Sequence, residues 1–129
     1  MPTLAELMRP ELVEVAPEDT LGEVAERLND VGMGAAVVKD FGKLIGIITE
    51  RDLLKAMAAR VHTSEARVRQ WMTEDPVTAP GDTEADAAAK EMLERGFRHL
   101  PVVDETGRVV GIVSLRRVVA AAQAAPHSA

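Results

Sequence analysis

The sequence predicts a mixed α/β (α+β) protein made of two tandem β-α-β-β-α repeats. The first observation is an internal repeat: residues 42–49 (GKLIGIIT) recur as residues 107–114 (GRVVGIVS), at an offset of 65 residues. Upstream, residues 15–20 match residues 78–83 at an offset of 63. The second observation is that segments of helical period alternate with short apolar runs. Two copies of about 60 residues, differing by an indel in a connecting loop, account for the chain.

The first copy opens with a short strand around residues 12–15, which leads through a proline to a helix. Thr20 and Glu23 have capping-box spacing, and apolar residues follow at helical period. Gly32 is the expected stop residue. Two apolar runs, residues 35–38 and 44–48, flank a glycine-containing turn and predict antiparallel strands. A last helix opens at Thr49.

The second copy has the same order of elements. A strand at residues 77–79 precedes a helix from Asp82 to about Arg95, which ends at Gly96. Strands are expected at residues 100–103 and 109–113, followed by a helix that opens at Ser114. The strands are apolar on both faces, so helices must cover the sheets.

The segment between the copies, residues 64–72, resembles a short capped helix rather than a flexible linker, because it is not rich in glycine and serine. We therefore expect one repeat at residues 1–62 and another at 63–123, packed rigidly as one module. Residues 124–129 are expected to be a frayed tail.

Composition excludes several classes of function. The chain has 129 residues, no cysteine, a net charge of −6 and only 2% aromatic residues. Thiolate catalysis and zinc ribbons are excluded, and neither a basic nucleic-acid face nor an aromatic stacking platform is expected. There is no secretory signal and no apolar run of membrane-spanning length, so a cytoplasmic location with no membrane or nucleic-acid partner is expected. No glycine-rich phosphate loop, metal-spaced histidine pair or nucleophile elbow is present, which argues against an enzyme and against any required cofactor or metal.

Residues 98–114 (RHLPVVDETGRVVGIVS), together with Gly34, Ala35 and residues 42–53 of the first copy, resemble the cystathionine-beta-synthase (CBS) domain pattern. The resemblance covers the chain from Leu4 to about Ala121 and is that of a small stand-alone bacterial-type CBS pair, or Bateman module. It implies two repeats related by a pseudo-two-fold axis, a homodimer, and regulation of a protein partner. It also implies an adenosine ligand (AMP, ADP, ATP or S-adenosylmethionine) in the cleft between the repeats. A ligand-free dimerisation or partner-regulating scaffold is the alternative, and an unrecognised small hydrolase or transferase is a third possibility.

Thr49 and Asp52 are the leading candidates for ligand binding. Their spacing places a hydroxyl at the N-cap and a carboxylate in the first helical turn, beside the end of a buried strand. In the family that this chain resembles, this Thr-x-x-Asp binds the ribose hydroxyls. The alternative is an ordinary capped helix, in which the carboxylate interacts favourably with the helix dipole without any ligand.

The remaining candidates surround that pair. Arg98 and His99 resemble basic residues that reach ligand phosphates in related pairs, and the alternative for them is a solvated arginine beside a hydrogen-bonded histidine. Gly34 and Ala35 would allow close backbone approach to a base. The candidates for the walls around the base are Ile47, Val15 and Pro17, and the alternative, which is favoured for each of them alone, is core packing.

The second copy departs from the pattern at the ribose-binding position. It has Ser114, but Arg117 stands where the family's aspartate falls. Arginine has no acceptor for sugar hydroxyls. The second site is therefore empty, rebuilt for an anion or structural, and one adenosine site per chain is expected.

Overall fold

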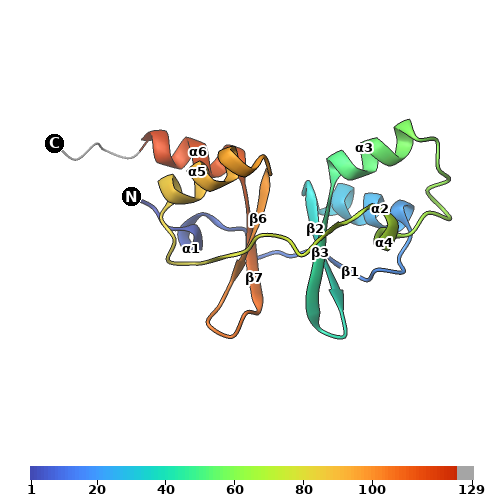
Figure 1. Ribbon diagram of the computed structural model, residues 1–129, viewed down its shortest axis with the longest axis horizontal. Helices are drawn as coiled ribbons and strands as arrows, with labels where there is room; N and C mark the ends of the chain where they lie inside the picture. The colour runs from blue at the N-terminus through green and yellow to red at the C-terminus, as the bar shows by residue number, and fades with distance from the viewer. Residues whose placement is uncertain (125–129) are drawn as a thin grey trace. The chain divides into compact units, whose positions relative to one another are not determined.

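The computed structural model describes residues 1–124, which divide into two compact units. Unit 1 consists of Met1–Leu12 together with the chain from Val77 onward, and unit 2 consists of Val13–Pro76. Each unit holds one β-α-β-β-α motif (Figure 1), so the predicted fold class is confirmed. Of the predicted tail, Ala124 ends a helix and residues 125–129 lie outside the described residues.

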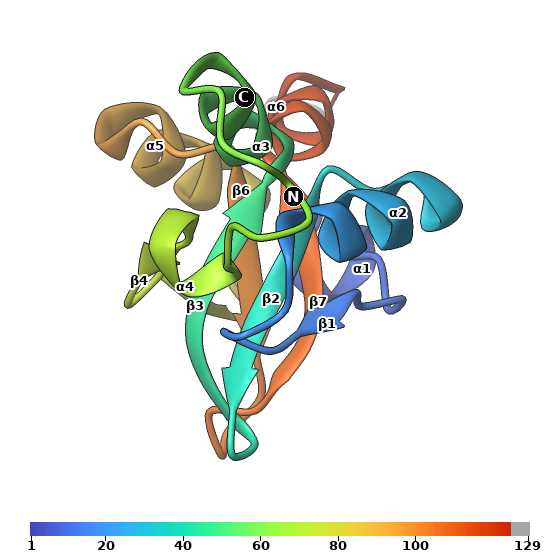
Figure 2. The same ribbon diagram turned by 90° about the vertical axis from the view of Figure 1, so that its right-hand side faces the viewer.

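Unit 2 contains a four-stranded sheet with the order β1-β2-β3-β4. β1 pairs in parallel with β2, whereas β2–β3 and β3–β4 are antiparallel. The β2–β3 hairpin begins beside the start of α3, and its turn lies at the end of the two strands away from that helix (Figure 2). The elements of this unit are β1 (Glu14–Val15), α2 (Leu21–Val31), β2 (Ala35–Asp40), β3 (Lys43–Thr49), α3 (Glu50–Ala58), α4 (Val68–Trp71) and β4 (Thr73–Glu74).

The ends of α2 agree with the sequence prediction. The Thr20 hydroxyl accepts from the Glu23 N–H at 3.2 Å, and the Glu23 carboxylate accepts from the Thr20 N–H at 3.3 Å. Gly32 closes the helix with φ 75°, a left-handed conformation that glycine adopts without steric cost. Between these caps α2 places its apolar side chains in one core with those of the sheet; the core includes Leu21, Val24, Leu28, Ala36, Val38 and Ile48.

Unit 1 contains a three-stranded sheet with the order β5-β6-β7, in which β5–β6 is parallel and β6–β7 antiparallel. Its core combines helix and strand side chains, including Ala88, Met92, Leu100 and Val118. The elements are α1 (Leu4–Leu7), β5 (Ala79–Pro80), α5 (Ala85–Arg95), β6 (His99–Val103), β7 (Val109–Ser114) and α6 (Leu115–Ala124).

The leading segment of each sequence repeat lies in the unit formed mainly by the other repeat. In unit 1, Leu4 N–H donates to the Thr83 carbonyl at 2.9 Å, and Arg9 bridges Ile112 of β7. In unit 2, α4 lies in the segment between the two copies, and β4 follows it. β4 pairs with Gly46 and Ile47 of β3. Unit 1 is therefore not contiguous in the chain. The predicted repeat boundary at residue 62 stays a prediction about the sequence.

Candidate functional site

Thr49 and Asp52 form a complete capping box at the start of α3. The Asp52 carboxylate atom Oδ2 accepts from the Thr49 N–H at 2.9 Å and from the Thr49 hydroxyl at 3.1 Å. The Thr49 hydroxyl in turn accepts from the Asp52 N–H at 3.3 Å. Both side chains are half-buried. The capping box expected from the spacing of this pair is therefore present, and whether the pair also binds a ligand stays a prediction.

The same geometry leaves Asp52 with acceptor capacity. Both hydrogen bonds to the carboxylate go to Oδ2, and Oδ1 accepts none from residues 1–124. A carboxylate oxygen has two acceptor positions, and a charge-assisted bond to it is stronger than a neutral one. The cap and a ligand can thus use different oxygens of one carboxylate.

Gly34 and Ala35 lie beside this cap. Ala35 at the start of β2 pairs with Thr49 at the end of β3, and the Gly34 carbonyl accepts from the Glu50 N–H at 2.9 Å. A Cβ at Gly34 would stand 3.2 Å from the Glu50 carboxylate, so the position has room only for glycine unless Glu50 moves. The structure therefore brings Gly34, Ala35, Thr49 and Asp52 together at one helix start.

Ile47 and Val15 lie on opposite faces of the unit 2 sheet. Ile47 is two residues from Thr49 in β3 and pairs with Val37, so it shares a face with Thr49. Val15 packs in the helix-covered core with Val38 and Ile48. The structure thus groups Ile47, but not Val15, with the capping pair.

Pro17 has a structural role that the sequence did not reveal. It is buried, and its carbonyl accepts from the Arg69 N–H at 2.8 Å, which fixes α4 to the loop after β1.

Arg98 and His99 occupy in unit 1 the positions that Gly34 and Ala35 occupy in unit 2. His99 pairs with Ser114, and the Arg98 carbonyl accepts from the Leu115 N–H at 2.7 Å. Ser114 caps α6 by accepting from the Arg117 N–H at 3.3 Å. Arg98 and Arg117 are exposed at this helix start. At the start of α6, Arg117 therefore stands at the position that Asp52 occupies at the start of α3, and Arg98 at the position of Gly34.

One residue beside the cap, Glu50, was missed in the sequence. Its carboxyl group lies against Gly34, and it is the first residue of α3. Its position directly after the candidate Thr49 was the available signal. No group of three or more His, Cys, Asp or Glu side chains within the described part of the chain is arranged to hold a metal ion. Within the same residues, no helix is both long and apolar enough to span a bilayer.

Comparison with known families gives two matches to the CBS domain, at residues 4–59 and 68–124. Together they cover most of the chain. The chain belongs to the CBS-domain family. The two matches are consecutive copies, so this protein is a CBS pair.

Two relatives place the pair in longer proteins. The chain is 40% identical over 103 residues to a 17.7 kDa protein in the bps2 3′ region of Acidianus ambivalens, covering 79% of this chain and 62% of that one. It is 34% identical over 114 residues to the inosine-5′-monophosphate dehydrogenase of Methanocaldococcus jannaschii, covering 88% of this chain and 22% of the enzyme. The chain thus spans about three-fifths of the first relative and about a fifth of the second.

Two solved structures are similar over nearly the full length. The CBS domain pair of protein MJ0100, in complex with 5′-methylthioadenosine and S-adenosyl-L-methionine, has a TM-score of 0.83 at 27% identity, covering 95% of this chain and 97% of that one. The complex of CBSX2, a CBS-pair protein of Arabidopsis thaliana, with AMP has a TM-score of 0.74 at 28% identity. The match covers 95% of this chain and 97% of that one. CBS pairs similar to this one therefore bind adenosine compounds.

Proposed function

We propose that this protein is a regulatory, ligand-sensing CBS pair that binds an adenosine derivative at the start of α3. The observation that carries the proposal is the Asp52 carboxylate, whose Oδ2 closes the cap while Oδ1 accepts no hydrogen bond within residues 1–124. The adenosine complexes of MJ0100 and CBSX2 support the ligand class. AMP, ADP, ATP and S-adenosylmethionine are the candidate ligands.

Each neighbouring residue has a chemical role in this proposal. The ribose hydroxyls donate to Asp52 Oδ1, each such bond contributing about 1.5–3 kcal/mol. Gly34, with no side chain, lets the ligand approach the backbone beside Glu50. Ala35 and Ile47 supply apolar surface on the sheet face that holds Thr49. Arg98 and His99 are proposed as donors to ligand phosphates.

A thermal-shift panel tests the proposal with AMP, ADP, ATP, S-adenosylmethionine, NAD and guanine nucleotides. A ligand at 100 times its Kd adds about 2.7 kcal/mol of stability, or about 10 °C for a domain of this size. Asp52→Ala should abolish the shift. This variant also loses its capping box, so a lower melting temperature without ligand is expected and is not the test.

Glu23→Ala is the matched control, because it removes the N3 carboxylate from the Thr-based capping box of α2, in the same unit. It should lose a similar cap stability of about 1 kcal/mol and keep the full response to ligand. If both variants lose the ligand-induced thermal shift equally, ligand binding depends on the stability of unit 2 and not on the Asp52 carboxylate. No shift with any compound would contradict the sensor.

A ligand-free scaffold that forms a homodimer is the second candidate. Leu54 and Met57 of α3 are 64% and 65% exposed, on neighbouring turns of one helix. We propose that the protein is a homodimer and that these side chains contribute to its interface. Sedimentation as a monomer at micromolar concentration, in the presence and absence of AMP, would contradict this.

We propose a regulatory and non-catalytic role for this chain. In the inosine-5′-monophosphate dehydrogenase relative, the matching region is about a fifth of a longer enzyme. A module of this kind would regulate a partner protein or an attached domain. Turnover of a nucleotide by the purified protein, detected by a product assay, would contradict the non-catalytic role.

A further inference from the structure

Unit 2 contains an open hollow of about 420 Å³ that takes no part in the candidate site. None of its residues belongs to the Thr49–Asp52 group. Its volume falls in the range of small-molecule sites. The residues that line it are Val61, His62, Glu65, Ala66, Gln70 and Trp71.

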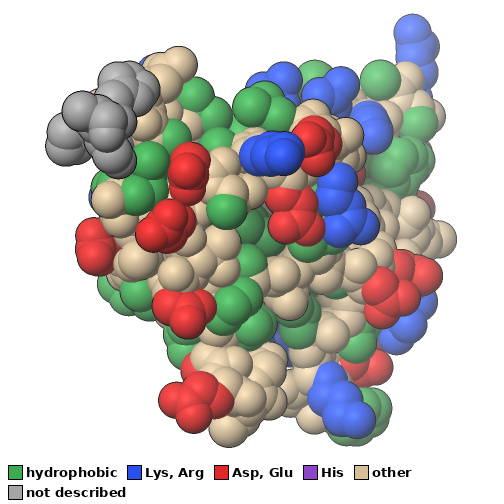
Figure 3. Space-filling model, turned by 60° about the vertical axis from the view of Figure 1, so that its left-hand side comes forward, with side chains coloured by type: hydrophobic (Ala, Val, Ile, Leu, Met, Phe, Trp, Pro, Cys, Tyr) green, Lys and Arg blue, Asp and Glu red, His purple; other side chains and the backbone are tan. Residues whose placement is uncertain are grey.

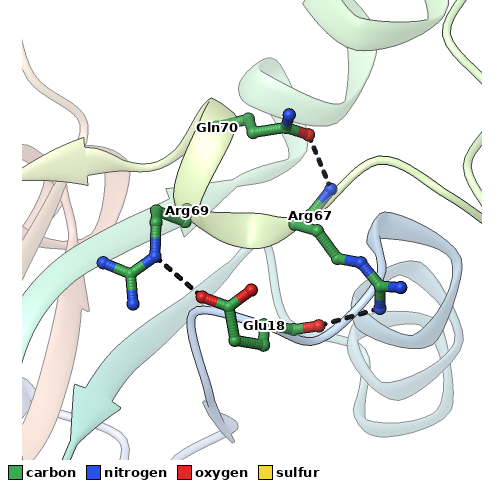
Figure 4. A network of polar contacts seen from close by, with 4 residues as sticks. All are labelled: Glu18, Arg67, Arg69 and Gln70. Carbon is green, nitrogen blue, oxygen red and sulfur yellow. Dashed lines mark hydrogen bonds and ion pairs between the residues drawn. The ribbon is translucent and has the colours of Figure 1, made fainter.

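One wall of the hollow is α4, which is fixed to the loop between β1 and α2. Arg67 donates to the Glu18 carbonyl at 3.0 Å, and Arg69 forms an ion pair with the Glu18 carboxylate at 2.8 Å (Figure 4). The backbone N–H of Val68 donates to the Asp19 carbonyl at 2.9 Å. In Figure 4 both arginine side chains reach toward Glu18, and Gln70 lies away from them. The two guanidinium groups are therefore directed away from the Gln70 side of α4.

The opposite wall is the turn after α3, which is fixed to α2. The Ala66 carbonyl accepts from the Leu21 N–H at 3.0 Å, and the Thr63 carbonyl accepts from the Gly22 N–H at 2.9 Å. Within the turn, the His62 carbonyl accepts from both Glu65 and Ala66. Both walls are thus held by backbone hydrogen bonds, so a ligand would meet a largely formed site and lose little free energy in ordering it.

The chemistry of the lining suits a cation. Trp71, the only tryptophan of the chain, packs against the core of unit 2 and also lines the hollow. The Glu65 carboxylate has no hydrogen-bond or ion-pair partner within residues 1–124. An indole ring and a free carboxylate together form a favourable site for an ammonium or guanidinium group.

Gln70 adds a polar group whose orientation is set. Its side-chain oxygen accepts from the Arg67 N–H at 3.0 Å and so is committed to the helix cap. Its amide nitrogen makes no hydrogen bond to any residue in the described range 1–124 and can donate to a ligand oxygen. No Lys or Arg side chain lines the hollow.

We propose that this hollow binds a small organic cation carrying a guanidinium or amine group, with Glu65 and Trp71 as the principal contacts. The site goes beyond the proposed adenosine function and is independent of it. Because its single carboxylate is solvent-exposed, the expected Kd is on the order of 1 mM.

Fluorescence of Trp71 tests the proposal on the wild-type chain, since no other tryptophan contributes to the signal. The probes are N-acetyl-arginine amide and its neutral isostere N-acetyl-citrulline amide, titrated to about 10 mM at constant ionic strength, which reaches about ten times the expected Kd. The arginine compound should give a saturating change and bind at least roughly tenfold more tightly than the citrulline compound. Calorimetry on the same pair detects binding if the fluorescence change is small.

The variants separate the contact from nonspecific attraction by an acidic protein. Glu65→Gln should weaken binding of the arginine compound roughly tenfold. The control Glu26→Gln removes the same charge from the exposed face of α2 in the same unit and should leave binding unchanged. Equal effects of the two variants, or equal binding of the charged and neutral probes, would overturn the proposal. So would the absence of both heat and fluorescence change.

Two further measurements identify the source of the cation and separate the two proposals. Tighter binding of agmatine than of the blocked arginine would indicate a free amine, and the reverse order an arginine side chain of a polypeptide. Asp52→Ala should leave the cation titration unchanged while abolishing the adenosine response. Loss of both responses in Asp52→Ala would overturn the independence of the hollow.

Discussion

Replacing Leu4 by alanine tests whether the first twelve residues belong to unit 1. The Leu4 side chain is fully buried in the core formed by α5, β6 and α6, although the sequence places it in the first repeat. The backbone is also fixed there, since Ala85 N–H donates to the Pro2 carbonyl at 2.8 Å and Ala5 N–H to the Gly81 carbonyl at 2.9 Å. A chain end held by both core and backbone contacts should contribute to global stability.

The expected cost follows from this burial. A fully buried Leu→Ala change costs about 2–5 kcal/mol, from lost transfer free energy and the cavity left behind. With a urea m-value of about 2 kcal/mol/M, a loss of 3 kcal/mol lowers the unfolding midpoint by about 1.5 M. Leu93→Ala is the control, because Leu93 of α5 is 63% exposed and its loss should lower the midpoint by no more than about 0.3 M.

Urea unfolding followed by circular dichroism measures the cost, and hydrogen exchange followed by mass spectrometry locates it. Exchange in Leu4→Ala should be faster in peptides from α5 and β6 than in peptides from α2 and β2. Equal midpoints for Leu4→Ala and Leu93→Ala would refute the reasoning. Acceleration confined to α2 and β2 would refute it as well, because it would place Leu4 with the contiguous repeat.

Four further predictions follow from particular contacts. Gly46→Ala and Gly111→Ala should each cost about 1–3 kcal/mol in urea unfolding. The new Cβ would lie 2.9 Å from the Thr73 carbonyl oxygen and 3.0 Å from the Arg9 carbonyl oxygen respectively, and backbone atoms cannot move aside as a side-chain end can. Gly34→Ala, which meets only the end of the Glu50 side chain, should cost less. Phe41→Asn should raise stability by about 0.5–1 kcal/mol, since Phe41 is 98% exposed with φ 50° and asparagine tolerates that conformation better; an unchanged or lower midpoint would contradict this. The pKa of the Asp104 carboxyl is lowered from its ordinary value, first because the Thr106 hydroxyl donates to it and next because the Arg108 N–H does. This stabilisation is present above the unfolded pKa and is lost as pH falls through the lowered folded pKa, so Asp104→Asn should lose less stability than wild type on acidification through that range, measured by urea unfolding. Titration calorimetry with the adenosine ligand should show one site per chain, and two equivalent sites would contradict the interpretation of Arg117.

The secondary structure was largely predictable because each repeat carries its own start and stop signals. Thr20, Thr49 and Ser114 cap helices as expected, and Gly32 and Gly96 end them with φ near 75°. The helix expected at residues 64–72 is shorter in the structure, Val68–Trp71, because the turn before it is fixed to α2 by its carbonyls. The helix expected from Asp82 begins at Ala85, because its N-cap, Glu84, makes no side-chain capping hydrogen bond and the start carries no local signal.

The long-range arrangement was less predictable. Nothing in the pattern of residues 1–12 distinguishes packing on the first repeat from packing on the second, since both would bury Leu4. Likewise, Val15 and Ile47 are both apolar strand residues, and only the register shows that they lie on opposite faces of the sheet. A single sequence does not show which segments far apart in the chain come into contact. Nor does it show which face of the sheet a residue occupies when the strand is apolar on both faces.

The face shown in Figure 3 carries charged side chains of both signs. On the face shown in Figure 3, Asp and Glu side chains stand beside Lys and Arg side chains instead of giving way to a continuous basic area. That the protein has no nucleic-acid partner stays a prediction from the net charge of −6.

The two repeats agree in character at the core positions compared below and differ at the helix starts, where the candidate site lies. At equivalent core positions the pairs Ile48 and Val113, and Val38 and Val102, are all buried and apolar, because each sheet must be covered by helices. At the helix starts, Glu50 and Asp52 of unit 2 correspond to Leu115 and Arg117 of unit 1. Both helices keep a hydroxyl cap, so the fold does not require this difference. Asp52 is thus replaced by Arg117 while the hydroxyl cap is retained. This pattern is expected if the start of α3 binds ribose hydroxyls, which need an acceptor, and the start of α6 does not.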